Sequence, residues 1–392
     1  MSEPDPRERG VPWNTRTVRA VLASTALAPL GVPLIAPGIA PIRDEFAISN
    51  ARASLLISAY FVVGIVLSPF IGLLIDRIGR RRMLAAGLTT FGAFGTAMAF
   101  APSFDVVLAL RVLQGTGAAT IFISTVTIIT DTFEDAQRNT VLGVNVAVLS
   151  AAAAIFPVIG GLLVELAWNA PFLAYAAAFP VAAFVLIGVD EPVRSAPDRG
   201  LEYVRSAIDV VVEPVVLSLF GATILTEFLA FGVVFTTVPI VLARSISPVW
   251  IGVTLFGAET VATLVAAGSG RLARGLANLH IIALGFACYA LGFFGIWAAP
   301  APLFVAMALL VVGAGLGLLL PTVDAAIGAR IDSAHRAGAF SVRNSATFFG
   351  RAAGPITFVG LAETDLVGFD PLLLAAGIVA LAAAVLAWRA AE

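Results

Sequence analysis

Residues 72–82 read GLLIDRIGRRR and join two long apolar stretches of the chain. Gly72 and Gly79 are small residues of the kind that let helices approach closely at a tight turn. Asp76 is suited to the positive end of a helix dipole, which favours an anion. The segment also carries four basic residues that can bind carboxylates or lipid phosphates, namely Arg77, Arg80, Arg81 and Arg82. We therefore predict a basic turn at a membrane surface, between two membrane-spanning helices.

The composition around this turn is that of a membrane protein. Of 392 residues, 59% are hydrophobic and only 12% are charged, and the mean hydropathy is +0.99. A soluble domain usually has about a quarter charged residues. A helix needs roughly 20 apolar residues to cross the hydrocarbon layer, where lipid offers the backbone no hydrogen-bond partners. The alternation over about 10 residues that marks a membrane β-barrel is not the pattern here. We expect an all-α membrane protein.

Twelve apolar runs are long enough to cross a membrane. They are 17–40, 53–75, 83–101, 105–130, 140–164, 170–189, 214–242, 248–270, 279–298, 302–327, 339–361 and 370–388. The long link at 190–213 divides the chain into an N-terminal six-helix bundle (1–189) and a C-terminal six-helix bundle (214–392). Within the link, residues 201–211 carry apolar side chains at helical spacing, which predicts an amphipathic helix on the membrane surface.

The distribution of arginine predicts the orientation, because basic loops stay on the cytoplasmic side. With the N-terminus inside, only Arg43, Arg52 and Arg244 of the 23 basic residues fall in loops on the outer side. We therefore expect a multi-pass protein of the cell (cytoplasmic) membrane with both termini in the cytoplasm. Residues 1–16 are polar and precede a run longer than a signal-peptide core, so we predict no cleaved signal.

The two halves of the chain carry similar sequence features at corresponding positions. Residues 270–278 read GRLARGLAN and form a weaker copy of the basic turn, at the corresponding loop of the second half. Span five contains Pro157, and span eleven contains Pro355 directly after Gly354. Transporters are commonly built from such repeats, with the solute site near the bilayer midplane between them.

Two motifs resemble those of the major facilitator superfamily of transporters. Residues 72–81 match the loop motif G-x-L-x-D-R-x-G-R-R, and residues 111–119 (RVLQGTGAA) match the motif R-x-x-Q-G-x-G-A-A of span four. The resemblance implies two pseudo-symmetric bundles that rock about a central cavity and open it to each side in turn. In that family the loop motif acts as a latch that stabilises the outward-facing state. Here Asp76, Arg77 and Asp131 would contact the neighbouring helix ends.

A third motif matches less well. Proton-coupled exporters of the family often carry G-P-x-x-G-G in span five, whereas residues 156–161 read FPVIGG, with Phe156 in place of the first glycine. We expect Pro157 to bend the helix and Gly160 and Gly161 to allow close packing. The pair Gly354–Pro355 predicts a similar bend in span eleven. The departure at Phe156 leaves the direction of transport open.

Four charged residues lie within predicted spans: Arg111, Glu227, Glu259 and Arg351. A charge at the bilayer centre costs at least about 2.5–3.5 kcal/mol, so such residues usually face a cavity or a partner. One hypothesis is that Glu227 or Glu259 carries protons, because a motion that changes exposure or pairing would load and release a proton. The alternatives are a static ion pair, for example Glu227 with Arg351, or direct binding of a cationic solute. The family resemblance links Arg111 to proton transfer, and the alternative is that it orients the helices of its bundle.

Other polar residues in the spans have more ordinary interpretations. Gln114 and Asn145 are expected to form interhelical hydrogen bonds, with solute binding as the alternative. Asp324 lies about one turn from the end of span ten, so we interpret it as a structural surface group that reaches water or Arg330. Prolines and glycine of span one are expected to loosen a helix that lines the cavity.

The leading functional hypothesis is proton-coupled efflux of small amphiphilic or cationic drugs or metabolites. The alternative is a symporter or facilitator that takes up an anionic or neutral metabolite, held by Arg111 and Arg351. A membrane enzyme would need clustered catalytic groups, and neither these nor a P-loop is present in the sequence. His280 and His335 are too far apart in sequence to suggest a metal site. We expect no cofactor and no nucleic-acid partner, and a monomer that interacts with solute, protons and membrane lipids.

Overall fold

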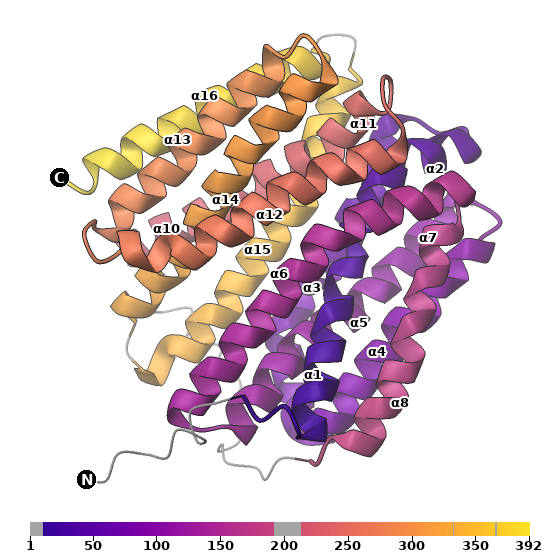
Figure 1. The fold of residues 1–392 in the computed structure, drawn as a ribbon, viewed down its shortest axis with the longest axis vertical. Coiled ribbons are helices and arrows are strands. Elements are labelled where there is room, and N and C mark those ends of the chain that lie inside the picture. Colours follow the sequence, from indigo (N-terminus) through magenta and orange to yellow (C-terminus); the bar gives the residue numbers. More distant parts are fainter. Residues whose placement is uncertain (1–10, 192–212, 332, 365–366) are drawn as a thin grey trace.

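The computed structural model describes residues 11–191, 213–331, 333–364 and 367–392 (Figure 1). Within these ranges the regular structure is helical and contains no strand, as expected for the predicted fold class. The amphipathic helix predicted at 201–211 lies outside the described residues. Most of the predicted dividing link at 190–213 lies outside them as well, so the division there stays a prediction.

The helices follow the predicted spans closely. The first half contains α1 (Arg16–Leu27), η2 (Ala28–Gly31), η3 (Ala36–Gly38), α2 (Ile39–Glu45), α3 (Asn50–Ile78), α4 (Arg80–Ala97), η4 (Met98–Phe100), α5 (Phe104–Thr132), α6 (Asp135–Leu166), α7 (Ala170–Leu173), η5 (Ala174–Ala177) and α8 (Ala178–Gly188). The second half contains α10 (Pro214–Leu229), η6 (Ala230–Thr237), α11 (Val238–Leu242), α12 (Pro248–Leu272), α13 (Asn278–Trp297), α14 (Pro302–Arg330), α15 (Ser333–Ala362) and α16 (Phe369–Arg389).

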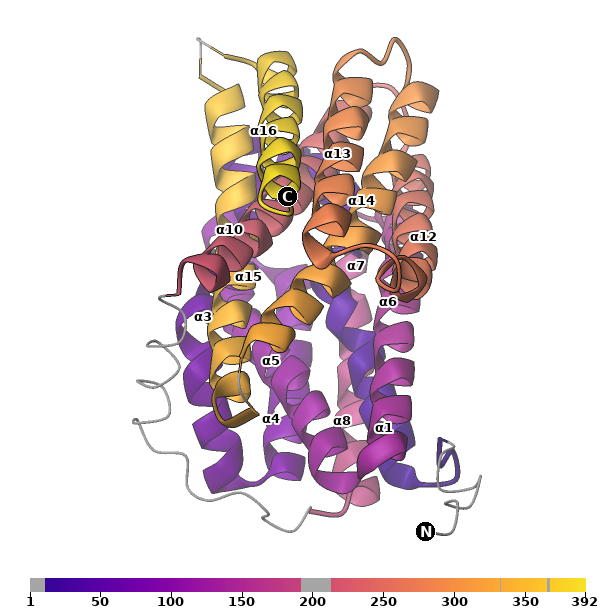
Figure 2. The ribbon, with the colours of Figure 1, turned by 90° about the vertical axis from the view of Figure 1, so that its left-hand side faces the viewer.

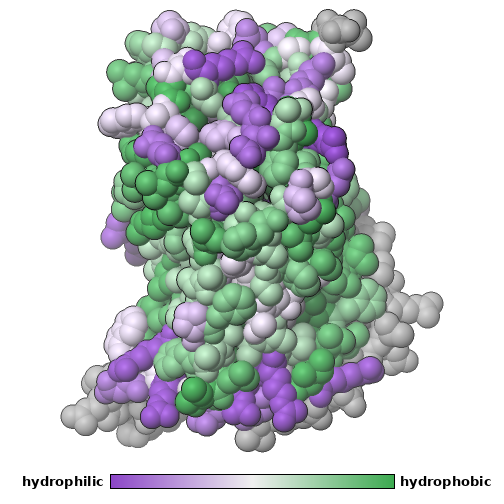
Figure 3. Space-filling model, turned by 90° about the vertical axis from the view of Figure 1, so that its right-hand side faces the viewer, coloured by the Kyte–Doolittle hydropathy of each residue, from purple (hydrophilic) through white to green (hydrophobic). Residues whose placement is uncertain are grey.

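Eleven helical stretches of the described residues are long and apolar enough to cross a membrane. The remaining predicted span, the eleventh in chain order, is α15, which has 30 residues but a more polar sequence. It carries two of the charged residues that lie inside the protein, Arg343 and Arg351. Figure 3 shows hydrophobic residues gathered in a broad band between two hydrophilic ends of the molecule. Such a band is the surface expected of a protein that faces lipid along its sides.

The helices of each half pack mainly with one another, and the two halves lie side by side (Figures 1 and 2). The main contacts between the halves are two antiparallel helix pairs, α3 with α15 and α6 with α12. A Cβ on Gly161 of α6 would lie 2.5 Å from the carbonyl oxygen of Pro248, at the start of α12. Gly160 lies even closer to the backbone of Leu34 within the first half. The two glycines therefore allow the close packing that the sequence predicts.

The first span is interrupted in the stretch that contains its prolines and glycine. The α-helix α1 ends at Leu27, and the 3-10 segments η2 and η3 follow before α2 begins. Proline lacks a backbone N–H and cannot complete the helical hydrogen-bond pattern. Pro29, Pro33 and Pro37 recur through this stretch. The sequence predicted one loosened helix at 17–40, and the structure shows two short helices joined by irregular turns.

The seventh span changes its helical winding near the middle. The segment η6 is a π-helix of 8 residues between α10 and α11. The hydroxyl groups of Thr236 and Thr237 donate hydrogen bonds to the carbonyl oxygens five residues earlier, at 2.7 and 2.8 Å. Short π-helical segments within helices are frequent at functional sites. The sequence of this segment does not predict a π-helix.

Candidate functional site

Glu227 of α10 and Arg351 of α15 form an ion pair inside the second half. The two guanidinium nitrogens Nε and Nη2 of Arg351 each lie 2.9 Å from a carboxylate oxygen of Glu227. The side chain of Glu227 is 2% exposed and that of Arg351 is 28% exposed. A bidentate pair of this kind is strong and geometrically specific. The static pair that the sequence analysis kept as an alternative is therefore present.

Aromatic rings from both halves cover this ion pair. The guanidinium carbon of Arg351 lies 4.9 Å from the ring centre of Phe231 in η6 and 5.5 Å from that of Phe61 in α3. The rings of Phe61 and Phe231 meet edge to face, with their centres 5.1 Å apart. A cation over an aromatic face is stabilised by the ring's negative charge density. Since Phe61 belongs to the first half, the ion pair lies at the contact between the halves.

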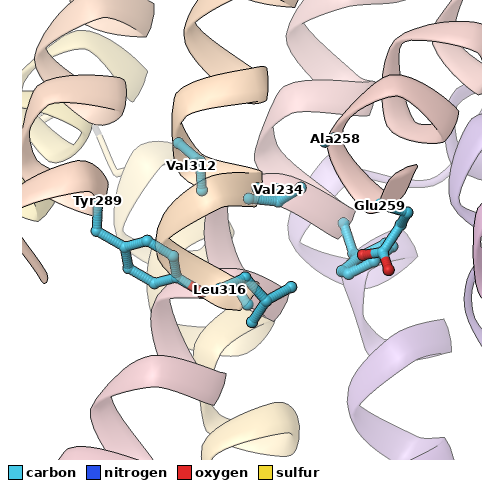
Figure 4. Close-up of a pocket in the computed structure, with 9 residues that line it drawn as sticks. Val234, Ala258, Glu259, Tyr289, Val312 and Leu316 are labelled. Carbon is cyan, nitrogen blue, oxygen red and sulfur yellow. The ribbon is translucent and has the colours of Figure 1, made fainter. Parts of the chain in front are cut away.

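Glu259 of α12 has a different environment. Its side chain is half-buried, and its carboxylate forms no ion pair or hydrogen bond among the described residues. It lines a small pocket in the second half together with Tyr289 of α13 (Figure 4). The remaining walls are apolar and come from η6, α12 and α14. Of the two acids that the sequence singled out, only Glu259 has a carboxylate without a cationic partner in this part of the structure.

Arg111 of α5 is fully buried in the first half, where its partners are neutral groups. Its guanidinium donates hydrogen bonds to the carbonyl oxygen of Leu56 at 2.8 Å and to the side chain of Gln114 at 2.6 Å. It also donates to the hydroxyl of Tyr175 at 3.1 Å and to the carbonyl oxygen of Gly31. These partners lie on four different parts of the half, so Arg111 joins its helices together. The geometry favours the alternative in which this residue orients the bundle.

Of the two polar residues predicted to form interhelical hydrogen bonds, Asn145 forms one, whereas the hydrogen bond of Gln114 lies within its own helix. Asn145 of α6 accepts a hydrogen bond from the hydroxyl of Thr25 in α1 at 2.6 Å. Gln114 accepts from Arg111 within its own helix, and its amide nitrogen has no hydrogen-bond partner among the described residues. The structure therefore places Arg111 and Gln114 together in one half and Glu227, Glu259 and Arg351 in the other.

The basic turn is built around Arg80, which is buried at the start of α4. Its guanidinium contacts Asp76 at 2.8 Å and Asp131 of α5 at 2.9 Å. Its backbone N–H donates to the carboxylate of Glu191, just after α8. Gly79 precedes it with a φ of +105°, a conformation that other residues rarely adopt. The three acids therefore hold one end of the first half together.

Two details of the predicted basic turn need correction. Asp76 lies in the last turn of α3, not at a helix N-terminus. Asp76 and Asp131 both contact Arg80. A Cβ on Gly72 would meet no described atom within 4 Å, so the close approach expected there is not seen. The Arg80 side chain reaches Asp76 and Asp131 across the turn at Gly79. Spacing in the sequence does not show such a reach.

Asp324 of α14 also differs from expectation. Its carboxylate lies 2.8 Å from the Nε atom of Arg343 in α15, so its partner is not Arg330. Arg343 and Arg351 are eight residues apart, which places them on the same side of α15. Each of these arginines thus pairs with an acid from another helix of the second half. The partner of Asp324 depends on which faces of α14 and α15 meet, and the sequence alone does not define those faces.

A further carboxylate joins the two halves at the opposite end from the basic turn. Glu363, just after α15, accepts hydrogen bonds from the backbone N–H groups of Asn50 at 2.6 Å and Ala51 at 2.8 Å. These N–H groups begin helix α3 of the first half. Partial burial raises the pKa of Glu363, but the hydrogen bonds from Ala51, Ser49 and Asn50 outweigh it and hold the pKa below its ordinary value. The sequence analysis did not identify Glu363, because an acid in a loop carries no signal of its partner.

Tyr289 and Phe61 were also not predicted as site residues from the sequence. Both lie in apolar runs, where an aromatic residue is ordinarily a packing residue. A signal was available for Tyr289, since a hydroxyl in a spanning segment needs a partner.

Pro157 and Pro355 lie inside α6 and α15 as predicted, and Gly354 packs against the backbone of Phe228 in α10.

Comparisons with known proteins bear on this arrangement. The family described as "Major Facilitator Superfamily" matches residues 21–355. The bacillibactin exporter of Bacillus subtilis (strain 168) is 26% identical over 85% of this chain and 86% of its own length. The multidrug efflux pump LfrA of Mycolicibacterium smegmatis is 32% identical over 42% of this chain and 34% of its own length. The crystal structure of a bacterial homolog of the human lysosomal transporter Spinster superposes with a TM-score of 0.79 at 16% identity, covering 97% of this chain and 98% of that one.

Proposed function

Because this chain belongs to the major facilitator superfamily, a family of multi-pass membrane transporters and not of enzymes, we propose that it is a proton-coupled exporter of small organic compounds. It alternates between states that open a site between its halves to one side of the membrane and then to the other. Both termini lie in the cytoplasm, and the protein acts as a monomer in the cell membrane. The halves divide at 190–213.

One observation carries the proposal of proton coupling, namely the environment of Glu259. Its carboxylate lies in the apolar part of the second half and has no cationic partner among the described residues. An uncompensated charge at such a depth costs at least about 2.5–3.5 kcal/mol, and binding a proton removes that cost. Glu227, by contrast, has both oxygens bound by Arg351 and serves as a fixed partner.

The position of Glu259 also couples it to movement of the halves. It follows Gly252 by seven residues, about two helical turns, and therefore lies on the same side of α12. Gly252 packs directly against the backbone of Pro157 in α6 of the first half. A rocking motion changes the packing of α6 on α12, so it changes the access of water to Glu259. That change in hydration loads and releases the proton.

Two features support export of amphiphilic compounds. The similar proteins named above are an exporter and a multidrug efflux pump. Phe61, Phe231 and Phe348 place aromatic rings at the contact between the halves, with Phe61 and Phe348 6.0 Å apart. Aromatic rings bind apolar and cationic groups alike. The alternative of anion uptake is weaker, since protein groups bind all three guanidinium nitrogens of Arg111, and Glu227 binds the Nε and Nη2 atoms of Arg351.

The decisive experiment uses purified protein in lipid vesicles with an imposed proton gradient. The probe is a lipophilic fluorescent cation, a common substrate type for multidrug carriers. We expect proton-driven accumulation by the wild type, loss of accumulation in Glu259→Gln, and retained exchange of probe across the membrane in that variant. Glu227→Gln is the matched control, because it removes an acid of the same half that we assign a structural role.

The outcomes separate the alternatives. Probe and protons moving in the same direction would indicate symport, and indifference to the gradient would indicate a facilitator. Proton-driven accumulation that survives in Glu259→Gln would refute the assignment of Glu259.

A further inference from the structure

The pocket beside Glu259 has a composition unlike that of a packing defect. It is lined by two polar side chains, Glu259 and Tyr289, and otherwise by apolar residues of η6, α12 and α14. Figure 4 shows Tyr289 on one side of the pocket and Glu259 on the other, with Val234, Val312 and Leu316 near them. Cavities that form by imperfect packing alone are apolar and stay dry. Two polar groups from different helices indicate that this pocket binds something polar.

The hydroxyl of Tyr289 supports this interpretation independently. The side chain is fully buried, and its hydroxyl has no hydrogen-bond partner among the described residues. Leaving a buried hydroxyl unsatisfied costs about 1–3 kcal/mol. Tyr175, the other fully buried tyrosine of the described residues, has its hydroxyl bound to the carbonyl oxygen of Leu30 at 3.0 Å. The contrast indicates that the hydroxyl of Tyr289 has a ligand as its partner.

The size of the pocket restricts that ligand. The cavity volume is about 10 Å³, far below the roughly 300–1,000 Å³ of sites that bind drug-sized molecules. A space of about this size, measured for the centre of a water molecule, holds one water, which needs two to four polar partners. The pocket therefore suits water and excludes the transported solute.

The wall of the pocket contains the irregular part of the seventh span. Ala230, Val234 and Phe235 belong to the π-helix η6 and line the pocket directly. The wider winding of a π-helix changes the side-chain positions along a helix. The three residues of η6 contribute apolar side chains to the pocket wall.

From these observations we infer that the pocket holds an ordered water molecule on the hydroxyl of Tyr289, and that this water delivers the proton to Glu259. To load Glu259, the bound water first accepts a proton and becomes hydronium. One O–H bond of the hydronium then breaks, and the proton forms an O–H bond on the carboxylate. Neutral Glu259 and water remain. Release follows the same step in reverse. Tyr289 is thus a positioning residue, and the inference rests on the proposed role of Glu259.

The charged groups around Glu259 are consistent with this path. Glu227 and Arg351 are the charged residues that act on Glu259 electrostatically. Because they are bound to each other, their effects at Glu259 largely cancel. Of the helices packed against α12, α14 contributes only apolar residues to the pocket, and α6 presents Pro157 to Gly252. Apart from Glu259 itself, the hydroxyl of Tyr289 is therefore the polar side-chain group that lines the pocket and can hold a water there.

The test removes the hydroxyl and leaves the ring. In Tyr289→Phe we expect proton-driven export to fall about tenfold at neutral pH, since a hydrogen bond that supports a charged group is lost. The pH midpoint of export should move toward alkaline values by about one unit, because a drier carboxylate holds its proton more tightly. Exchange without a gradient should persist. The infrared band of protonated Glu259, assigned by its loss in Glu259→Gln, should titrate with the same shift in purified protein.

Two further variants keep the test decisive. Val234→Leu adds bulk to the pocket wall without touching a polar group, so it should produce the same shift even if Tyr289→Phe folds poorly. Tyr175→Phe removes a buried hydroxyl from the other half and should leave the carboxyl band unmoved. Unchanged pH midpoints in both pocket variants would overturn the water site while leaving a proton-driven exporter intact. A wild type that ignores the proton gradient, or responds to sodium instead, would overturn the proposed function itself.

Discussion

Glu363→Gln is expected to shift the balance between the two open states of the transporter. In the structure its carboxylate binds two backbone N–H groups at the start of α3, in the other half of the molecule. This contact exists only while the halves are together at that end. Glutamine keeps one acceptor oxygen but loses the negative charge that the helix N-terminus favours. The variant should therefore populate the state in which that end is open.

The magnitude follows from the two terms that are lost. A charge at a helix N-terminus is worth about 0.3–1 kcal/mol, and a capping hydrogen bond about 0.5–2 kcal/mol. Glu363 is exposed to solvent, so values near the lower ends apply. A total of about 1 kcal/mol changes the ratio of the two states about fivefold.

The assay measures the distance between spin labels placed on the two halves. Phe100 and Leu303 are 75% and 68% exposed and lie at the same end of the molecule as Glu363, in different halves. Cysteine replaces both in a background where Cys288, the one native cysteine, is serine. We expect the population at long distance to rise about fivefold relative to the parent. Asp44→Asn is the matched control, because Asp44 is an exposed acid at that end that pairs with its neighbour Arg43.

The same contact predicts a pH dependence. The pKa of Glu363 is held below its ordinary value of 4.5. A carboxylate with a lowered pKa contributes its full stabilisation above that ordinary value and loses it as the pH falls through the lowered one. Acidification into that range should open this end in the parent and have little further effect in Glu363→Gln. Equal distance distributions in the parent and the variant at neutral pH would refute the reasoning.

Three other perturbations have defined outcomes. Glu227→Gln leaves Arg351 without its carboxylate, so the melting temperature of the purified protein should fall by several degrees, and a neutral residue at Arg351 in the same chain should recover part of the loss. Gly161→Val should weaken the packing of α6 on α12 and lower thermal stability, whereas Gly143→Val, where a Cβ meets no described atom within 4 Å, should not; equal melting curves would contradict the packing argument. Arg111→Lys cannot reproduce the fork of donors that reaches four partners, so it should destabilise the first half by about 3 kcal/mol in denaturant unfolding, while an unchanged midpoint would point back to a role in proton transfer.

The spans, the class of fold and the family could be read from the chain because each depends on local features. The tendency of an apolar run to cross the membrane as a helix depends on its own composition and length, and not on the helices that it packs against. The motifs at 72–81 and 111–119 are short and contiguous, so they are visible without a structure. Prolines in span one likewise indicated a loosened helix, since the missing N–H is a property of the residue itself.

The sequence suggested possible partners for the buried charges but did not decide among them. It offered Glu227 and Glu259 as equivalent acids in adjacent spans, with a Glu227–Arg351 pair as one alternative, and it offered Arg330 as the partner of Asp324. The structure pairs Glu227 with Arg351, 124 residues away, and Asp324 with Arg343. It also joins Glu363 to α3 across 312 residues. Each pairing depends on which faces of two distant helices meet.

The amino-acid sequence by itself thus determined that the chain forms membrane helices of a superfamily transporter, because hydropathy and contiguous motifs act within one segment. Only the tertiary structure decided that Glu227 is bound by a guanidinium while Glu259 shares a pocket with Tyr289. The physical reason is that the ionisation of a carboxyl group depends on the charges and the water within a few ångströms of it. In a helical bundle those neighbours come from other helices, and their identity is a property of the packing.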